Sequence, residues 1–162
     1  MKKWTGKIYK SLLGLAAFLP LPVFAQLNNY SFEEIDSIEK TNPKFIVVFI
    51  HTDWCKYCQS MMHTTLQNEQ VIEVLNEHFL YTALDAEFKN DIVFNHHRFH
   101  YMPSGYNTGT HELATALGTI NDKLSFPTIC ILNRHYEIIF QHASFILADD
   151  LLSILEQTLL TE

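Results

Sequence analysis

The sequence predicts one α/β domain built on a central mixed β-sheet with helices on both faces. Two patterns indicate this fold class. In the first half, apolar β-branched runs alternate with amphipathic stretches, which is typical of parallel strands joined by helices. Near the end, the apolar runs Ile129–Leu132 and Tyr136–Gln141 are separated by a short turn, which favours an antiparallel pair. A length of 162 residues fits a single domain.

Residues 1–25 have the composition of a cleaved secretory signal peptide. A lysine-rich start precedes the apolar run Ser11–Ala25, whose end suits cleavage between Ala25 and Gln26. An uncleaved membrane anchor is the alternative, but this run is shorter than a bilayer span requires and contains Pro20 and Pro22. We therefore expect a mature domain of residues 26–162 that works in the periplasm or outside the cell.

The charge of the chain disfavours two classes of partner. The formal net charge is −7, and removal of the signal segment, which holds four lysines and no acidic residue, makes it more negative. Proteins that bind nucleic acids need basic surfaces to neutralise phosphates, and adsorption to anionic lipid needs them too. Nucleic acid is therefore not expected as a partner.

The elements of the first half follow from caps, breakers and hydrophobic patterns. Ser31 and Glu34 form a capping box that begins a short helix, and Asn42-Pro43 separates this helix from a buried strand. The expected elements are a helix at 31–40, a strand at Lys44–Ile50, helices at 56–66 and 68–78, and a strand at Phe79–Asp85.

The second half contains a predicted β-hairpin insertion at about residues 89–109. Asp91–Asn95 and Arg98–Met102 have the pattern of two short strands about a His96-His97 turn. Pro103–Gly109 is expected to be a loop because it is rich in turn residues. The expected helices that follow span 111–117, stopped by Gly118, and 147–160 at the end of the chain.

Two of the three cysteines form a Cys-x-x-Cys motif between a buried strand and a helix. A helix start presents free N–H groups and positive dipole character, which stabilise a thiolate at Cys55. Cys58 lies one turn further on, within disulfide reach. We therefore expect Cys55 to be the nucleophile and Cys58 to resolve the mixed disulfide, and Lys56 to assist modestly with its positive charge.

Trp54-Cys55-x-x-Cys58 after a β-strand resembles the thioredoxin superfamily, and Phe126-Pro127-Thr128 matches the second landmark of that family. The wider segment is similar to the reducing domain of membrane thiol:disulfide interchange proteins. The resemblance covers about residues 31–160 and implies a thioredoxin fold with a cis bond before Pro127. It further implies a substrate-binding surface formed by the landmark residues Trp54, Phe126, Pro127 and Thr128.

The sequence departs from ordinary thioredoxin at several positions near the cysteines. Lys56-Tyr57 replaces the usual Gly-Pro between them, and Phe49 stands where thioredoxins have a buried acid. The loss of that acid leaves open how Cys58 loses its proton, and Glu87 or a water is a candidate replacement. No histidine lies between the cysteines, as it does in strongly oxidising members, so the resemblance favours reduction over oxidation.

Several other side chains can be interpreted as either structural or functional. Cys55 and Cys58 with His51 and His63 form an alternative zinc site, but a structural zinc usually needs a second ligand pair. Cys130, within an apolar run, is expected to be a buried and inert thiol. The cluster formed by His96, His97 and His100 is expected to be a solvated hairpin surface. Nearby aromatic residues are expected either to pack the insertion or to bind a partner: Phe94, Phe99, Tyr101 and Tyr106.

These observations together predict an exported thiol:disulfide oxidoreductase that acts on disulfides of protein substrates. The reaction needs no cofactor or metal, but it needs a membrane or periplasmic redox partner to reset the dithiol. Two alternatives remain: a redox-independent substrate-binding or chaperone-like module of the same fold, and a metal carrier that uses the Cys-x-x-Cys pair.

Overall fold

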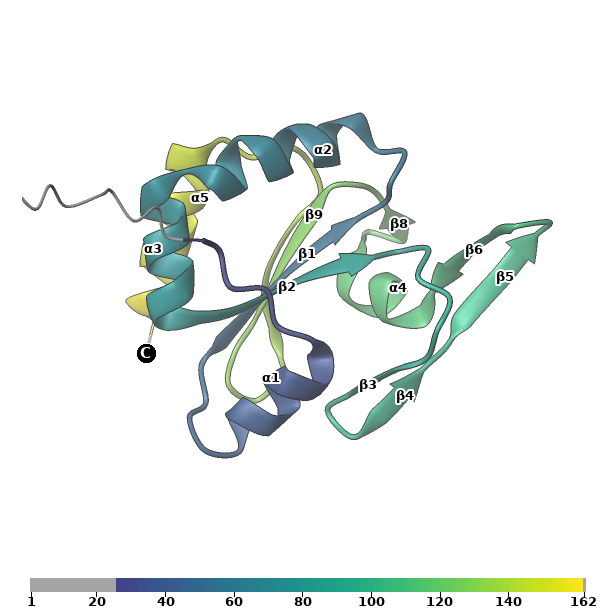
Figure 1. Ribbon diagram of the computed structural model, residues 1–162, viewed down its shortest axis with the longest axis horizontal. Coiled ribbons are helices and arrows are strands. Elements are labelled where there is room, and N and C mark those ends of the chain that lie inside the picture. Colours follow the sequence, from purple (N-terminus) through teal and green to yellow (C-terminus); the bar gives the residue numbers. More distant parts are fainter. Residues whose placement is uncertain (1–25, 162) are drawn as a thin grey trace, which may run out of the picture.

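A computed structural model describes residues 26–161 and shows a four-stranded mixed sheet in the order β10-β9-β1-β2 (Figure 1). Strands β1 (Phe45–His51) and β2 (Phe79–Asp85) are parallel. Strand β9 (Thr128–Leu132) pairs antiparallel with β1, and β10 (Ile138–His142) pairs antiparallel with β9. The predicted mixed sheet is confirmed. The predicted signal peptide lies outside the described residues.

Helices cover both faces of this sheet, as predicted (Figure 1). One face carries α2 (Lys56–His63), α3 (Glu69–His78) and α5 (Ala148–Leu159), with a short 3₁₀ helix at Thr65–Gln67 after α2. The other face carries α1 (Phe32–Glu39) and α4 (Glu112–Gly118). Within residues 26–161, no helix combines the length and hydrophobicity needed to cross a bilayer.

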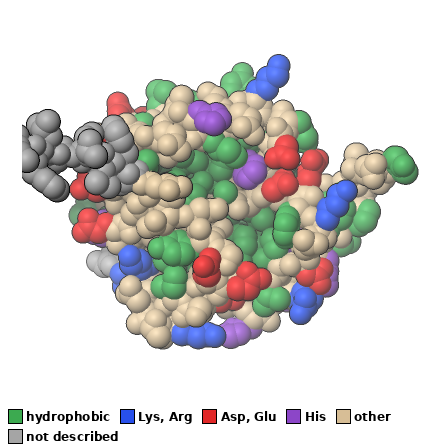
Figure 2. Space-filling model, in the orientation of Figure 1, with side chains coloured by type: hydrophobic (Ala, Val, Ile, Leu, Met, Phe, Trp, Pro, Cys, Tyr) green, Lys and Arg blue, Asp and Glu red, His purple; other side chains and the backbone are tan. Residues whose placement is uncertain are grey.

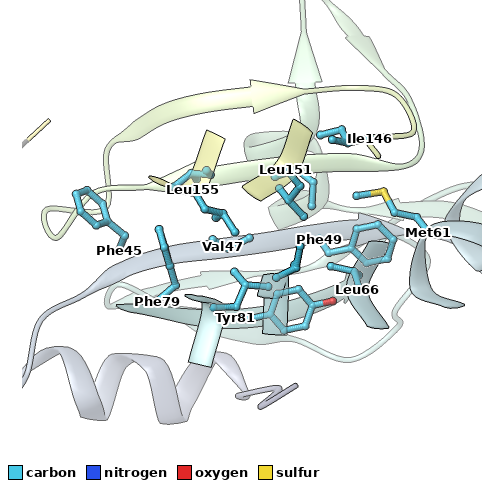
Figure 3. Packing of buried hydrophobic residues seen from close by; sticks show 14 of the residues in the cluster. Phe45, Val47, Phe49, Met61, Leu66, Phe79, Tyr81, Ile146, Leu151 and Leu155 are labelled. Carbon is cyan, nitrogen blue, oxygen red and sulfur yellow. The ribbon is translucent and has the colours of Figure 1, made fainter. Parts of the chain in front are cut away.

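Strand β1 forms the centre of two separate cores because its side chains alternate between the faces. Phe45, Val47 and Phe49 pack under α2, α3 and α5, together with Tyr81 and Leu155 (Figure 3). The intervening residues, Ile46, Val48 and Ile50, pack toward α1 and α4. Burial on both faces explains why the strand is a continuous apolar run in the sequence.

Side-chain caps begin four of the described helices, among them α1, α3 and α4. The Ser31 hydroxyl accepts a hydrogen bond from the Glu34 backbone N–H, and the Glu34 carboxylate accepts one from the Ser31 backbone N–H, which completes the predicted capping box of α1. Asn68 caps α3, and the Nδ1 atom of His111 accepts a hydrogen bond from the backbone of Leu113 at the start of α4. These contacts set where each helix begins.

The insertion between β2 and α4 contains two hairpins. The first, β3 (Ile92–Phe94) with β4 (His97–Phe99), confirms the predicted hairpin, although its turn lies at Asn95-His96, where both residues have positive φ. The prediction of a loop at Pro103–Gly109 is wrong. That segment belongs to a second hairpin, β5 (Tyr101–Gly105) with β6 (Thr108–His111).

The second hairpin tolerates its proline because the ladder is irregular there. The register shifts between Pro103 and Gly105, and a two-stranded ribbon with a bulge can accommodate a residue that has no N–H. The close packing of Gly109 also requires glycine, because a Cβ atom there would lie 2.5 Å from the Met102 oxygen and the Tyr101 ring. The hairpin extends away from the body (Figure 1). Tyr106 at its turn is 94% exposed.

The first hairpin is held against α1 by aromatic and polar contacts. Phe94 packs edge-on against Phe32 at 5.0 Å and against Tyr136 at 5.2 Å between ring centroids. The Asp36 carboxylate accepts hydrogen bonds from the backbone of Asn95 and from the Tyr136 hydroxyl. A further small hairpin, β7 (Thr119–Ile120) with β8 (Lys123–Leu124), leads from α4 into the loop before β9 and was not predicted.

Candidate active site

The two cysteines of the motif lie where β1 gives way to α2. The chain leaves β1 after His51 and turns tightly, with the Cys55 backbone N–H donating to the Thr52 oxygen at 3.2 Å. Cys55 is the N-cap of α2, and its sulfur accepts the backbone N–H of Cys58 at 3.1 Å. Cys55 and Cys58 form a disulfide, with their Cα atoms 5.2 Å apart.

The two cysteines differ in their exposure to solvent. Cys55 is 6% exposed, whereas Cys58 is completely buried in the core beneath α2. An incoming sulfur can therefore approach Cys55 and not Cys58. This asymmetry is the arrangement that the sequence predicts for an attacking and a resolving cysteine.

Trp54 and the loop before β9 form an apolar surface next to the disulfide. Trp54 is 65% exposed and packs edge-on against Phe126, with ring centroids 6.0 Å apart. The bond between Phe126 and Pro127 is cis, as the resemblance implies. The Thr128 side chain is buried and its hydroxyl donates to the Ser125 oxygen at 2.7 Å, so Thr128 holds the shape of this loop from within.

Comparison with known proteins identifies the family. The model of the thioredoxin-like domain family matches residues 32–159. The chain belongs to the thioredoxin-like family. No curated protein matches its sequence at a significant level.

Solved structures show the same fold at low sequence identity. A DsbH oxidoreductase is 20% identical with a TM-score of 0.61, over 98% of this chain and 96% of that one. A thioredoxin from Thermus thermophilus is 19% identical with a TM-score of 0.59, covering 83% and 88% of the two chains. A putative disulphide-isomerase from Bacteroides thetaiotaomicron is 20% identical with a TM-score of 0.55, covering 84% and 93%.

This thioredoxin-like domain therefore has the features of a thiol:disulfide oxidoreductase: a cysteine pair in the oxidised form at the start of α2, in which Cys55 is the more exposed member. Thiol–disulfide exchange needs an attacking sulfur that is accessible and a second sulfur within bonding distance of it. Both requirements are met by protein atoms alone.

Glu87 is engaged at the surface of this thioredoxin-like domain. The Trp54 indole Nε1 donates to a Glu87 carboxylate oxygen at 3.1 Å, and the Glu87 backbone N–H donates to Asp85. Glu87 thus orients the exposed tryptophan. This contact does not support Glu87 as the replacement for the missing buried acid, whose position is occupied by the fully buried ring of Phe49.

His51, which the sequence suggested only as a zinc ligand, lies together with Thr52 in an unusual setting. The Nδ1 atom of His51 and the Oγ1 atom of Thr52 are buried and have no hydrogen-bond partner. Burial lowers the pKa of His51, while Asp85 and Asp53 partly oppose this shift. In the sequence, this setting is indicated only by two polar residues that directly follow a fully apolar strand.

Cys130 lies in β9 and belongs to the core on the opposite face of the sheet from the disulfide. Burial raises its pKa to about 12, so the thiol stays protonated at neutral pH. The prediction of a buried thiol is confirmed, and its pKa supports the predicted inertness.

His96, His97 and His100 are exposed, and the last two make surface contacts within the insertion. His100 Nδ1 lies 2.9 Å from an Asp91 oxygen, Arg98 pairs with the other oxygen at 3.3 Å, and the His97 ring packs edge-on against Phe99. Among residues 26–161, no three His, Cys, Asp or Glu side chains are placed to hold a metal ion together.

Proposed function

We propose that this thioredoxin-like protein is an exported oxidoreductase that reduces disulfides in protein substrates through Cys55 and Cys58. The observation that carries the proposal is the placement of the Cys55 sulfur. It is the accessible member of the pair, and it receives a backbone N–H at the start of α2. A helix start favours negative charge on that sulfur when the pair is reduced.

The reaction proceeds by two exchanges. The Cys55 thiolate attacks one sulfur of a substrate disulfide, a new sulfur–sulfur bond forms, and the other substrate sulfur leaves with the electron pair. Cys58 then loses its proton and attacks the Cys55 sulfur. The second substrate sulfur leaves as a thiolate, and the Cys55–Cys58 disulfide is restored. The substrate gains two electrons, which the dithiol supplies.

Substrate binding is assigned to the apolar surface beside Cys55. Trp54 and Phe126 present aromatic area there, and the exposed side chain of Tyr57 lies between the cysteines in the sequence. Aromatic side chains are effective in such contacts because they bury a large area at a small entropy cost. Extended segments of unfolded or misfolded proteins, which expose apolar side chains near cysteine, suit this surface.

The proposed function also requires export of the protein and reduction of its disulfide after each cycle. The lysine-rich start and apolar run of residues 1–25 support secretion and cleavage after Ala25. Each cycle leaves the pair oxidised, so a membrane or periplasmic partner must return two electrons. Expression of the full chain in a Gram-negative host, followed by N-terminal sequencing of the periplasmic protein, tests this part; a first residue other than Gln26 contradicts the cleavage site.

An insulin-reduction assay with dithiothreitol tests the enzyme. Wild-type protein accelerates precipitation of the insulin B chain, and Cys55→Ser abolishes the acceleration because no mixed disulfide can form with a serine. Cys130→Ser is the matched control, since Cys130 lies across the sheet from the pair. Turnover that persists in the Cys55 variant rules out the mechanism, whereas wild-type protein without any acceleration favours a redox-independent binding module.

A further inference from the structure

The second exchange needs a base, and the usual one is missing from this site. Cys58 is completely buried, and a thiol out of reach of water does not lose its proton readily. The buried position beneath α2 that would hold an acid is filled by Phe49, and Glu87 is bound to Trp54 at the surface. The proton of Cys58 therefore needs an acceptor other than these two side chains.

His51 lies on the same face of β1 as the disulfide. Phe49 belongs to the buried cluster that contains Cys55 and Cys58, and the His51 ring stacks on Phe49 with centroids 5.5 Å apart and planes 19° apart. Residues two apart on a strand share a face, so His51 follows Phe49 on the face of the sheet that carries the disulfide. Its Nδ1 atom is buried without a partner, although buried polar atoms nearly always have one.

The His51 ring also forms part of the wall of a surface cavity. It lines a cavity of about 620 Å³ that runs along the outer edge of β2 between α1 and the first hairpin. The charged groups around the ring are carboxylates: Asp53 in the turn, Asp85 opposite it on β2, and Glu33, Glu34 and Asp91 along the cavity wall. Figure 2 shows acidic side chains gathered near the carboxyl end of β2.

We propose that His51 is the proton acceptor for Cys58 in the second exchange. The inference rests on the proposed function. The Cys58 thiol transfers its proton to the unpartnered Nδ1 atom, and the resulting thiolate attacks the Cys55 sulfur. The cavity carboxylates stabilise the positive imidazolium that results. The imidazolium then releases its proton through the cavity to solvent, and the departing substrate thiolate takes up a proton from solvent.

A stopped-flow reaction with Ellman's reagent separates the two exchanges. Reduced protein in excess releases one coloured thiolate when Cys55 attacks and a second when Cys58 resolves the mixed disulfide. His51→Phe keeps the stacking on Phe49 but cannot accept a proton. We expect an unchanged first phase and a second phase slower by on the order of 100-fold at neutral pH. The wild-type second phase should lose rate as the pH falls and the imidazole becomes protonated, and this inflection should be absent in the variant.

His63→Phe is the matched control, because His63 lies exposed in the last turn of α2; it should leave both phases unchanged. His51→Ala tests the same step without a bulky replacement, and added imidazole should restore its second phase by entering the space beside the cavity. A second phase in His51→Phe with the wild-type rate and pH profile overturns the inference. So does a loss in His51→Ala that imidazole does not restore, since that loss is one of packing. Absence of both phases in wild type removes the proposed function itself.

Discussion

The backbone N–H of Cys58 points at the sulfur of Cys55 from 3.1 Å, which ties the attacking atom directly to the first turn of α2. This contact predicts that a reduced Cys55 ionises more readily than a free cysteine, whose pKa is about 8.5. In Cys58→Ser, Cys55 should react with iodoacetamide well below the pH at which a Trp-Cys model peptide does. The rate of alkylation measured against pH checks this. A curve that coincides with that of the peptide would show that the start of α2 does not stabilise the Cys55 thiolate.

The hydrogen bond between Trp54 and Glu87 predicts an effect on substrate affinity. Glu87→Ala frees the indole, so the aromatic surface must be ordered when a substrate binds. We expect the KM for insulin to rise roughly fivefold, which corresponds to about 1 kcal/mol, with little change in kcat. Glu87→Gln keeps an oxygen that accepts from the indole and should retain most of the affinity. Equal losses in the two variants would show that the charge of Glu87, rather than this hydrogen bond, matters.

The prediction from sequence succeeded where local chemistry decides the structure. Phe79–Asp85 was predicted with its observed bounds because an apolar run is bordered there by a polar helix end and a charged turn. The start of α1 followed from the Ser31 capping box, and the place of Cys55 at a helix start followed from the strand before it. In each case the determining residues are neighbours in the chain.

The features that were missed depend on contacts between distant residues. The β5–β6 hairpin contains Pro103, two glycines and polar residues, so it lacks the alternation typical of a strand and depends on its own cross-strand packing. The bond from Trp54 to Glu87 spans 33 positions. The unpartnered Nδ1 of His51 is recognised only once every neighbouring side chain has been placed.

Thr52, which lies directly before the turn to the cysteines, offers a test that does not depend on catalysis. Its hydroxyl is buried without a partner, so Thr52→Val removes an unsatisfied group while keeping the shape. We expect the free energy of unfolding of the oxidised protein to increase by about 1 kcal/mol. Thr128→Val is the matched control, because that hydroxyl donates to Ser125 and its loss should destabilise by about 1 kcal/mol. Urea titration measures both, and a destabilised Thr52→Val would reveal a partner for the hydroxyl.

The capping contact of His111 predicts how stability depends on pH. Nε2 lies 3.2 Å from the Asn90 oxygen and carries the proton, so Nδ1 is free to accept from Leu113. Burial lowers the pKa of His111 below that in the unfolded chain. The stabilisation is therefore complete above the unfolded pKa of about 6.5 and declines as the pH falls toward the lower folded value, because the unfolded state then binds more protons.

Replacement of His111 by Asn separates the effect of His111 protonation on stability from the effects of other groups. His111→Asn retains a side-chain oxygen that can cap α4 but cannot be protonated, so urea midpoints should fall less between neutral and mildly acidic pH than in wild type. Some decline should remain, because burial lowers the pKa of His51 as well and its effect has the same sign. His63→Asn should leave the wild-type slope intact, since His63 is exposed. If His111→Asn shows the full wild-type decline, protonation at the start of α4 is not what limits stability in acid.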